Sequence, residues 1–306
     1  MWNEFFGSFT ILFSVFLIAS TAGLFAERSG VTNIGINGMM ISGALTFALF
    51  GYSIHKVNPD ASNWWQLIGF ILAMMVGALF GLLHGFASIS LKADQVIVGM
   101  AINVLTAGIA LFVVTLPFAV GNRLDTGFDI LALDAYNIAS LYLFLAIILI
   151  IVTFIFFRYI KVGVWFAATG ENPNAVDAVG ISVVKMRYAG ICISGALAAL
   201  SGSIFTFYIS SAFLGNVAGS GYIALAIMIF GQWRIQYIAF GAALFSFLYV
   251  FAFQAAFLDG VPEWIKSNGD LLKMLPFIMA IVTMVIFSKT SNEPKALAQP
   301  FDKSKR

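Results

Sequence analysis

The sequence predicts a single-domain, all-α polytopic membrane protein over residues 1–306, with about eight to ten transmembrane helices and a short cytoplasmic helix. Hydrophobic residues make up 61% of the chain and charged residues only 10%, with a mean hydropathy of +0.97. A soluble core cannot use so much apolar surface. Apolar runs of about 20 residues, the length that crosses a ~30 Å hydrocarbon core, recur along the chain. The charged residues gather between these runs.

Nine apolar runs qualify as membrane spans, and we expect them at residues 8–26, 33–54, 64–86, 95–118, 137–157, 187–209, 217–233, 236–258 and 271–288. The first lacks a preceding basic segment and a convincing cleavage site, so we expect a membrane helix rather than a removed signal peptide. The second contains NIGING, whose glycines favour a break in the helix. The seventh is short and bounded by glycines (GSGYIALAIMIFG), which predicts a partial or re-entrant span.

Small residues mark two of these spans as close-packing helices. Gly77, Gly81 and Gly85 recur every four residues in the third span and therefore share one helix face. GALAALSG at 195–202 repeats the pattern in the sixth span. Small residues recur wherever membrane helices pack, so we interpret both runs as packing surfaces. Because both begin with GAL, the alternative is a degenerate internal repeat.

The basic residues indicate the orientation in the membrane. If the N-terminus is outside and all nine runs cross, the outer side holds only Lys56, Arg123, Lys266 and Lys273. The inner side then holds 12 of the 16 basic residues, namely Arg28, Lys92, Arg158, Lys161, Lys185, Arg187, Arg234, Lys289, Lys295, Lys303, Lys305 and Arg306. The positive-inside rule therefore predicts a multi-pass protein of the cell membrane with a cytoplasmic C-terminus.

Two polar segments lie outside the predicted spans. The loop 119–136 is the largest outer connection and carries one arginine and three aspartates. It is either a solvated loop or a docking surface for an external partner. The tail, about 289–306, is polar and contains prolines, so we expect a disordered cytoplasmic end.

Several function classes lack the residues that they need. The net charge of +2 is too small to suggest nucleic-acid binding, and Cys192 is the single cysteine, which excludes an internal disulfide framework. No GxxxxGK[ST], HExxH or GxSxG motif occurs, and His55 and His84 are separate and form no metal-pair motif. We therefore expect neither an enzyme nor a metal or cofactor site. Ion-driven carriers keep carboxylates or histidines at mid-membrane, where only His84 could lie.

The segment GENPNAVDAVGI at 170–181 lies between two apolar runs, yet it has the features of a short soluble helix. Asn172 is a good N-cap, and Pro173 suits the first helical position. Gly180 fits the left-handed position that follows a helix. A helix of under two turns is unstable alone, so its flanks or a partner must hold it. The alternative is an ordinary connecting loop.

The same segment resembles the cytoplasmic coupling loop of ATP-binding-cassette (ABC) importer permeases of the branched-chain amino acid, ribose and nucleoside group. AERSGVTNIGINGMM at 26–40 looks like the ERSGxxNIGxxGMM stretch of the nucleoside and general sugar branch. GYIALAIMIFGQW at 221–233 is similar to that family's GxxALAxxIFGxW, and MLPFIMAIVTMVIF at 274–287 resembles its closing stretch. The resemblance covers nearly the whole chain. Asn37 departs from it, because the family often has Glu there, which leaves any charge-based role at that position in doubt.

The resemblance implies a permease subunit that forms the translocation path of a nucleoside importer. Its implied partners are an ABC ATPase subunit that uses the ATP, a second related permease subunit in a heterodimer, an extracellular or lipid-anchored substrate-binding protein, the small-molecule solute and membrane lipid. The coupling loop would span about 158–187, with contact residues Gly170, Glu171, Asn172, Pro173, Asn174, Ala175, Val176, Asp177, Gly180 and Ile181. In the family picture Glu171, Asn172 and Asp177 make polar contacts with the ATPase. Ala175 and Val176 are the residues buried in it.

Neutral polar residues within the spans are the candidates for the translocation path, namely Asn33, Asn37, Asn103 and Thr106. Asn33 and Asn37 are four residues apart and would share a helix face, as would Asn103 and Thr106, three apart. A neutral lining suits an uncharged, hydrogen-bonding solute such as a nucleoside, whereas a carboxylate solute calls for a fixed cation. The alternative is that these side chains bridge helices.

Other functions stay open from the residues. The nearest alternative is an ABC permease for a simple sugar or a branched-chain amino acid. An ion-coupled secondary transporter would need a carboxylate in the membrane, and a membrane enzyme would need clustered acid, base or metal ligands at one interface. The sequence shows neither feature. The direction of transport follows from the resemblance alone.

Overall fold

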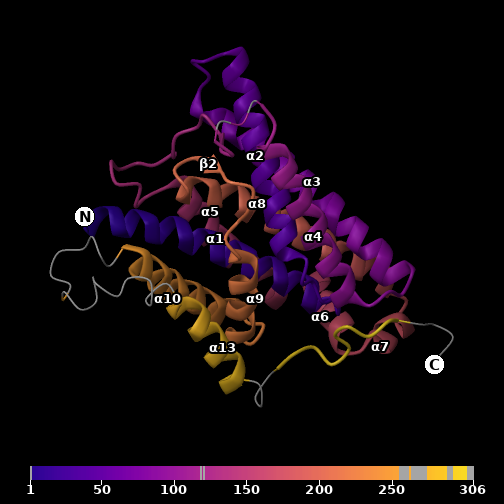
Figure 1. Ribbon diagram of the computed structural model, residues 1–306. Coiled ribbons are helices and arrows are strands. Elements are labelled where there is room, and N and C mark those ends of the chain that lie inside the picture. The colour runs from indigo at the N-terminus through magenta and orange to yellow at the C-terminus, as the bar shows by residue number, and fades with distance from the viewer. Residues whose placement is uncertain are drawn as a thin grey trace.

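The computed structural model of the chain describes residues 2–117, 119, 121–254, 262, 274–287 and 292–301, which form a bundle of helices with one two-stranded ribbon (Figure 1). In chain order its elements are α1 (Trp2–Arg28), α2 (Ile36–Val57), η1 (Asn63–Trp65), α3 (Gln66–Gly85), η2 (Phe86–Ser90), α4 (Gln95–Val114), β1 (Leu124–Asp125), α5 (Leu141–Tyr159), α6 (Lys161–Glu171), α7 (Pro173–Ala178), α8 (Val183–Tyr208), β2 (Ala212–Phe213), α9 (Ser220–Phe230), α10 (Ile235–Gln254) and α13 (Leu275–Phe287). The predicted all-α class is confirmed.

Seven helical segments of the described chain are long and apolar enough to cross a membrane, and they coincide with seven of the predicted spans. They are α1, α2, α3 with η1 and η2, α4, α5, α8 and α10. With 11 residues, α9 is about 16 Å long at 1.5 Å per residue, which is half of a ~30 Å hydrocarbon core. The partial span predicted at 217–233 is therefore confirmed. The ninth run contains α13, and its remaining residues, like 255–258 of the eighth, lie outside the described residues.

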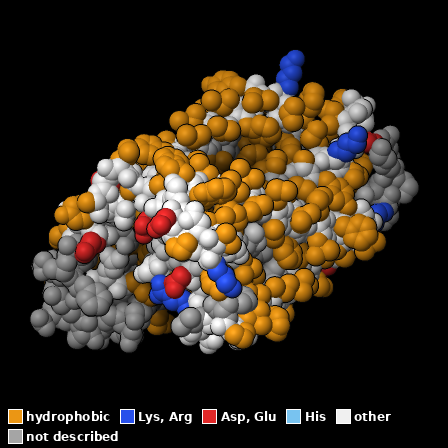
Figure 2. Space-filling model, turned by 90° about the horizontal axis from the view of Figure 1, so that it is seen from above, with side chains coloured by type: hydrophobic (Ala, Val, Ile, Leu, Met, Phe, Trp, Pro, Cys, Tyr) orange, Lys and Arg blue, Asp and Glu red, His pale blue; other side chains and the backbone are white. Residues whose placement is uncertain are grey.

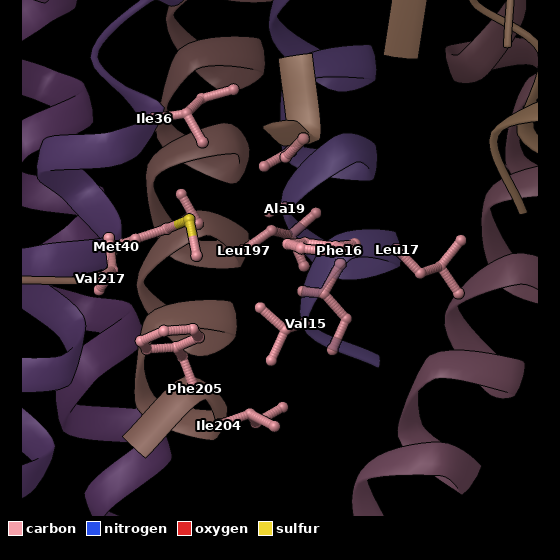
Figure 3. Packing of buried hydrophobic residues seen from close by; sticks show 14 of the residues in the cluster. Val15, Phe16, Leu17, Ala19, Ile36, Met40, Leu197, Ile204, Phe205 and Val217 are labelled. Carbon is pink, nitrogen blue, oxygen red and sulfur yellow. The ribbon is translucent and has the colours of Figure 1, made fainter. Parts of the chain in front are cut away.

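The centre of the bundle is α8, because α1, α2 and α3 all pack against it. Figure 3 shows Val15 of α1, Met40 of α2, and Leu197 and Ile204 of α8 within one buried apolar cluster. The hydroxyl of Ser201 also donates to the backbone carbonyl of Val15 at 2.7 Å. Close packing and interhelical hydrogen bonds of this kind hold membrane helices together, since the lipid itself is apolar.

The two small-residue motifs meet each other across the α3–α8 interface. Gly77 of α3 lies against Gly195 of α8, and a Cβ on either residue would collide with the backbone carbonyl of the other. A Cβ on Gly81 would lie 2.5 Å from the carbonyl oxygen of Ile191. The close approach of these helices therefore requires glycine, and the prediction of packing surfaces is confirmed.

The predicted break in the second span lies at its N-terminal end. Residues 29–35 are not helical, and α2 begins at Ile36. Asn33 thus precedes the helix, so the prediction that Asn33 and Asn37 share one helix face is wrong. The glycines of NIGING permit the break, and the buried Asn33 amide donates from Nδ2 to the hydroxyl of Ser194 in α8 at 2.9 Å, which holds this segment against α8.

The loop 119–136 is tied down at one end of the bundle. Leu124 of β1 pairs with Phe213 of β2 in an antiparallel ribbon. Asp134 accepts hydrogen bonds from three backbone N–H groups, the shortest from Ala139 at 2.7 Å. These hydrogen bonds hold the pKa of the Asp134 carboxyl below its usual value, because they stabilise its charged form.

We call the opposite end of the bundle the basic end. It is formed by α6, α7, the turn between α9 and α10, and residues 292–301 (Figure 1). Its basic residues in the described chain are Arg28, Lys92, Arg158, Lys161, Lys185, Arg187, Arg234 and Lys295. Between the ends, α3, α4 and α5 expose many large apolar side chains, such as Val104. Figure 2 shows a broad hydrophobic face of the molecule with Lys and Arg gathered toward its margins, as expected of a surface in contact with lipid.

Candidate functional site

The N-terminal end of α7 is capped as the sequence predicts. The side-chain Oδ1 of Asn172 accepts the backbone N–H of Ala175 at 3.1 Å. Pro173 follows at the first helical position, where its missing N–H leaves no hydrogen bond unmade. The cap and the proline thus account for two of the backbone positions that a helix start leaves without an intrahelical bond.

The C-terminal end of α7 closes in a Schellman motif. Gly180 has a φ of +83°, and its N–H donates to the carbonyl of Asp177 at 3.0 Å. The N–H of Ile181 reaches back to the carbonyl of Val176 at 3.2 Å. These are the two backbone hydrogen bonds that define the motif, so the predicted role of Gly180 in ending the helix is confirmed.

A second helix, α6, precedes α7 and is absent from the sequence-based prediction. It packs through Phe166, whose ring lies 6.2 Å from that of Phe25 in α1 and 5.9 Å from that of Phe156 in α5. At its end Gly170 lies against Arg28, where a Cβ would be 2.6 Å from the carbonyl oxygen. The short helix is therefore held by its flanks, which removes the instability expected of an isolated turn.

One face of α7 is buried within this chain and the other is exposed. Val176 is only 4% exposed and Gly170 is buried, so both face this chain rather than a partner, unlike the expectation from the resemblance. The exposed residues around α7 are Glu171, Asn172, Asn174, Ala175, Ala178, Val179 and Gly180, whereas Pro173, Asp177 and Ile181 are half-buried. Sequence reasoning missed Val179, which is 73% exposed. No periodic signal marks it, because a residue three positions after the buried Val176 would lie near the same face of a regular helix.

Residues 292–301 of the tail pack against the basic end, where we expected disorder. The N–H of Ala296 donates to the carbonyl of Gly170 at 2.8 Å. The carbonyl of Gln299 accepts from Nη1 of Arg187 at 2.7 Å. Arg187 is 1% exposed, and the tail backbone provides one acceptor for its buried guanidinium, whereas Nε and Nη2 have no hydrogen-bond partner among the described residues. The segment thus connects α6 with the beginning of α8.

Asn103 of α4 joins three parts of the bundle. Its Oδ1 accepts the N–H of Gly38 in α2 at 2.7 Å. Its Nδ2 donates to the carbonyl of Ile34 at 3.0 Å and to the hydroxyl of Tyr222 in α9 at 3.2 Å. A Cβ on Gly38 would lie 2.8 Å from the Cα of Asn103, so glycine permits this approach. Sequence reasoning missed Tyr222, which is 48% exposed and forms part of this cluster; the ALAxxIFG stretch around it carried no polar signal.

Asn37 and Thr106 belong to the same polar cluster. The Oδ1 of Asn37 accepts the N–H of Gly221, in the first turn of α9, at 3.3 Å, and its side chain is half-buried. Thr106 is 2% exposed, and its hydroxyl donates to a carbonyl one turn earlier in α4. The structure therefore brings Asn37, Asn103 and Thr106 together and leaves Asn33 apart, against α8.

The chemistry available in this cluster is neutral hydrogen bonding. Amide and hydroxyl groups can donate to and accept from an uncharged solute. The part of the chain that the structure describes holds no group of three or more His, Cys, Asp or Glu side chains arranged to bind a metal ion. His84 is fully buried at the end of α3.

Comparison with known proteins matches residues 5–284 to a family described as the permease component of the branched-chain amino acid transport system. The guanosine ABC transporter permease protein NupQ of Bacillus subtilis is 35% identical over 305 residues, covering 95% of this chain and 93% of NupQ. The nucleoside ABC transporter permease protein NupC of Lactococcus lactis is 29% identical, covering 94% and 93%. The putative glucose ABC transporter permease protein TsgC13 of Haloferax volcanii is 30% identical, covering 77% and 72%. No solved structure matches the chain significantly.

Proposed function

The chain belongs to the family of branched-chain amino acid transport system permease components, and from this premise we propose that it is the permease subunit of an ABC importer for nucleosides. It is a multi-pass membrane protein and forms a translocation path rather than an active site. The observation that carries the substrate class is the 35% identity to a guanosine permease across 95% of the chain.

We assign coupling to the ATPase subunit to the exposed face of α7. ATP is used by a separate ATPase subunit, and this chain needs no cofactor of its own. Glu171, Asn172, Asn174 and Ala175 offer polar and small contacts, and Val179 offers an exposed apolar one. The caps and the burial of its inner face make α7 a rigid element. Closure of the ATPase can therefore move it as a body and switch the bundle between two states.

The solute path is assigned to the cluster around the starts of α2 and α9. Asn37 and Tyr222 are its accessible members, and Asn103 and Thr106 support them from α4. The neutral hydrogen-bonding groups and the aromatic ring suit a nucleoside, whose base can stack and whose sugar donates and accepts hydrogen bonds. The burial of Asn33 against α8 argues for a structural role there.

Partners and orientation complete the proposal. A second, related permease subunit pairs with this one in a heterodimer, and a substrate-binding protein, extracellular or lipid-anchored, delivers the solute from outside. The basic end, including the tail, is cytoplasmic, as the distribution of Lys and Arg supports. Because Cys192 is the single cysteine, a Cys192→Ser background allows one new cysteine at Asp134 to be labelled with an impermeant reagent. We expect this cysteine to be labelled from outside the cell. Protection of the cysteine from the reagent would show that the orientation is the opposite one.

The function is tested by two measurements on the native membrane. Gentle-detergent pull-down of the chain should recover a related permease, an ATPase and a binding protein. Uptake of radiolabelled guanosine should be lost when the chain is removed and restored when it is returned. Glucose and leucine serve as competitors, because the likeness to a putative glucose permease and the family description favour these alternatives. Competition by either at guanosine-like concentrations would reassign the substrate, and a chain that transports alone would overturn the ABC assignment.

A further inference from the structure

A cavity of about 270 Å³ opens at the basic end between α1, α5, α6 and the turn that joins α9 to α10. Three of the six arginines in the chain line it, namely Arg28, Arg158 and Arg234. They come from the end of α1, the end of α5 and the α9–α10 turn, so only the tertiary fold brings them together. No acidic side chain is among the described residues that line the cavity.

One arginine of the cavity is fixed by hydrogen bonds. Arg28 donates from Nε and Nη2 to the carbonyl of Trp233 at 3.3 and 2.8 Å. The indole N–H of Trp233 in turn donates to a carboxylate oxygen of Glu27 at 2.6 Å. This chain of contacts fixes one guanidinium and the neighbouring turn, while Arg158 and Arg234 are exposed at the cavity's edge.

The charges around the cavity leave it positive. Arg28 is attracted by Glu171 and repelled by Arg234. Three guanidinium groups line the cavity, while the neighbouring carboxylates, Glu27 and Glu171, lie outside its lining, and the walls contributed by Phe154 and Phe157 are apolar. An anion in the cavity would relieve the repulsion.

The position of the cavity selects the anion. The planar guanidinium of arginine matches phosphate oxygens in a paired geometry that lysine lacks. The cavity lies where membrane-spanning helices end, and the exposed Ile151 and Ile155 extend an apolar surface from it along α5. Basic pockets between the ends of transmembrane helices suit lipid head groups. We propose that this cavity binds the phosphodiester head group of an anionic phospholipid, with its acyl chains along α5.

The test uses the full-length chain, with any subunits that co-purify, in nanodiscs of mixed phosphatidylcholine and phosphatidylglycerol. Native mass spectrometry after release into detergent measures how much phosphatidylglycerol stays bound. The double variant Arg158→Gln/Arg234→Gln alters two exposed side chains and leaves the Arg28–Trp233 contact in place. The matched control is Arg123→Gln, an exposed arginine at the other end of the bundle, paired with Asp125.

The wild type and Arg123→Gln should retain phosphatidylglycerol above its share in the nanodisc, and the double variant should bind it roughly 10- to 30-fold more weakly. Equal retention by the double variant would overturn the proposal. Displacement of phosphatidylglycerol by millimolar inorganic phosphate would also overturn the proposal. The cavity would then bind a free anion, and the acyl chains would contribute nothing to binding. If the double variant retained as much phosphatidylglycerol as the wild type but lost a co-purifying subunit, the proposal would fail and the cavity would be a contact surface for that subunit.

Discussion

Replacing Gly180 with valine should loosen the C-terminal end of α7 while leaving the bundle intact. Gly180 has a φ of +83°, and an L side chain in this left-handed region costs about 1–2 kcal/mol. A Cβ added there would meet no atom within 4 Å, so the effect is backbone strain and not a collision. The strain shifts the local equilibrium away from the capped helix by roughly 5- to 30-fold. A six-residue helix has little stability of its own to oppose this shift.

Gly121 provides the matched control for this substitution. Its φ is +61°, an added Cβ there also meets nothing within 4 Å, and it lies in the loop 119–136, away from α7. The assay is the initial rate of guanosine uptake, normalised to the amount of each variant in the membrane. Uptake should fall roughly 5- to 30-fold for Gly180→Val and stay near wild type for Gly121→Val. Unchanged uptake in Gly180→Val would refute the coupling role of α7, and equal losses in both variants would show an effect of strain in general.

Three further predictions address other parts of the molecule. Val179→Asp should weaken ATPase recovery in a pull-down roughly tenfold or more by placing a charge in an apolar contact. Val57→Asp is the control, because Val57 at the end of α2 is also exposed, 87% against 73% for Val179. Equal recovery in both variants would contradict the contact. Removing residues 292–306 should leave the buried Arg187 guanidinium without its tail acceptor and destabilise the protein by about 1–3 kcal/mol. This loss should appear as a lower thermal unfolding midpoint. An unchanged midpoint would show that the tail contact does not stabilise the protein. The folded pKa of Asp134 lies below its usual 3.8, because backbone N–H groups stabilise the charged carboxylate. The hydrogen-bonded turn that it forms should therefore be complete above pH 3.8 and open as the pH falls through the lowered pKa. Hydrogen exchange across this pH range should show the transition in the wild type and not in Asp134→Asn.

Local chemistry made part of the candidate site predictable. Asn172, Pro173 and Gly180 act through their own backbone geometry, so the capped helix could be inferred from 12 residues and is present as expected. Which face of that helix is free was not predictable in the same way. Val176 is buried by its contacts within this chain, and the presence of α6 depends on the packing of Phe166 against two other helices.

The same division applies to the polar residues of the spans. Periodicity placed Asn33 and Asn37 on one helix face, but the helix begins after Asn33, whose amide bonds to Ser194, 161 residues away. Asn103 was identified as a candidate, whereas its partner Tyr222 was hidden in an apolar run. A hydrogen bond between distant segments does not alter the hydrophobic periodicity of either segment, so it could not be predicted from the sequence.

The sequence by itself determined the membrane environment, the approximate spans, the short partial span and the capped helix, because each follows from hydrophobicity, length or the conformation of residues close in the chain. The tertiary structure alone decided that the glycine motifs face each other across α3 and α8, that residues 292–301 cover the buried Arg187, and that three arginines converge on one cavity. These features depend on how helices distant in sequence approach one another, and their packing is set by contacts that no single segment contains.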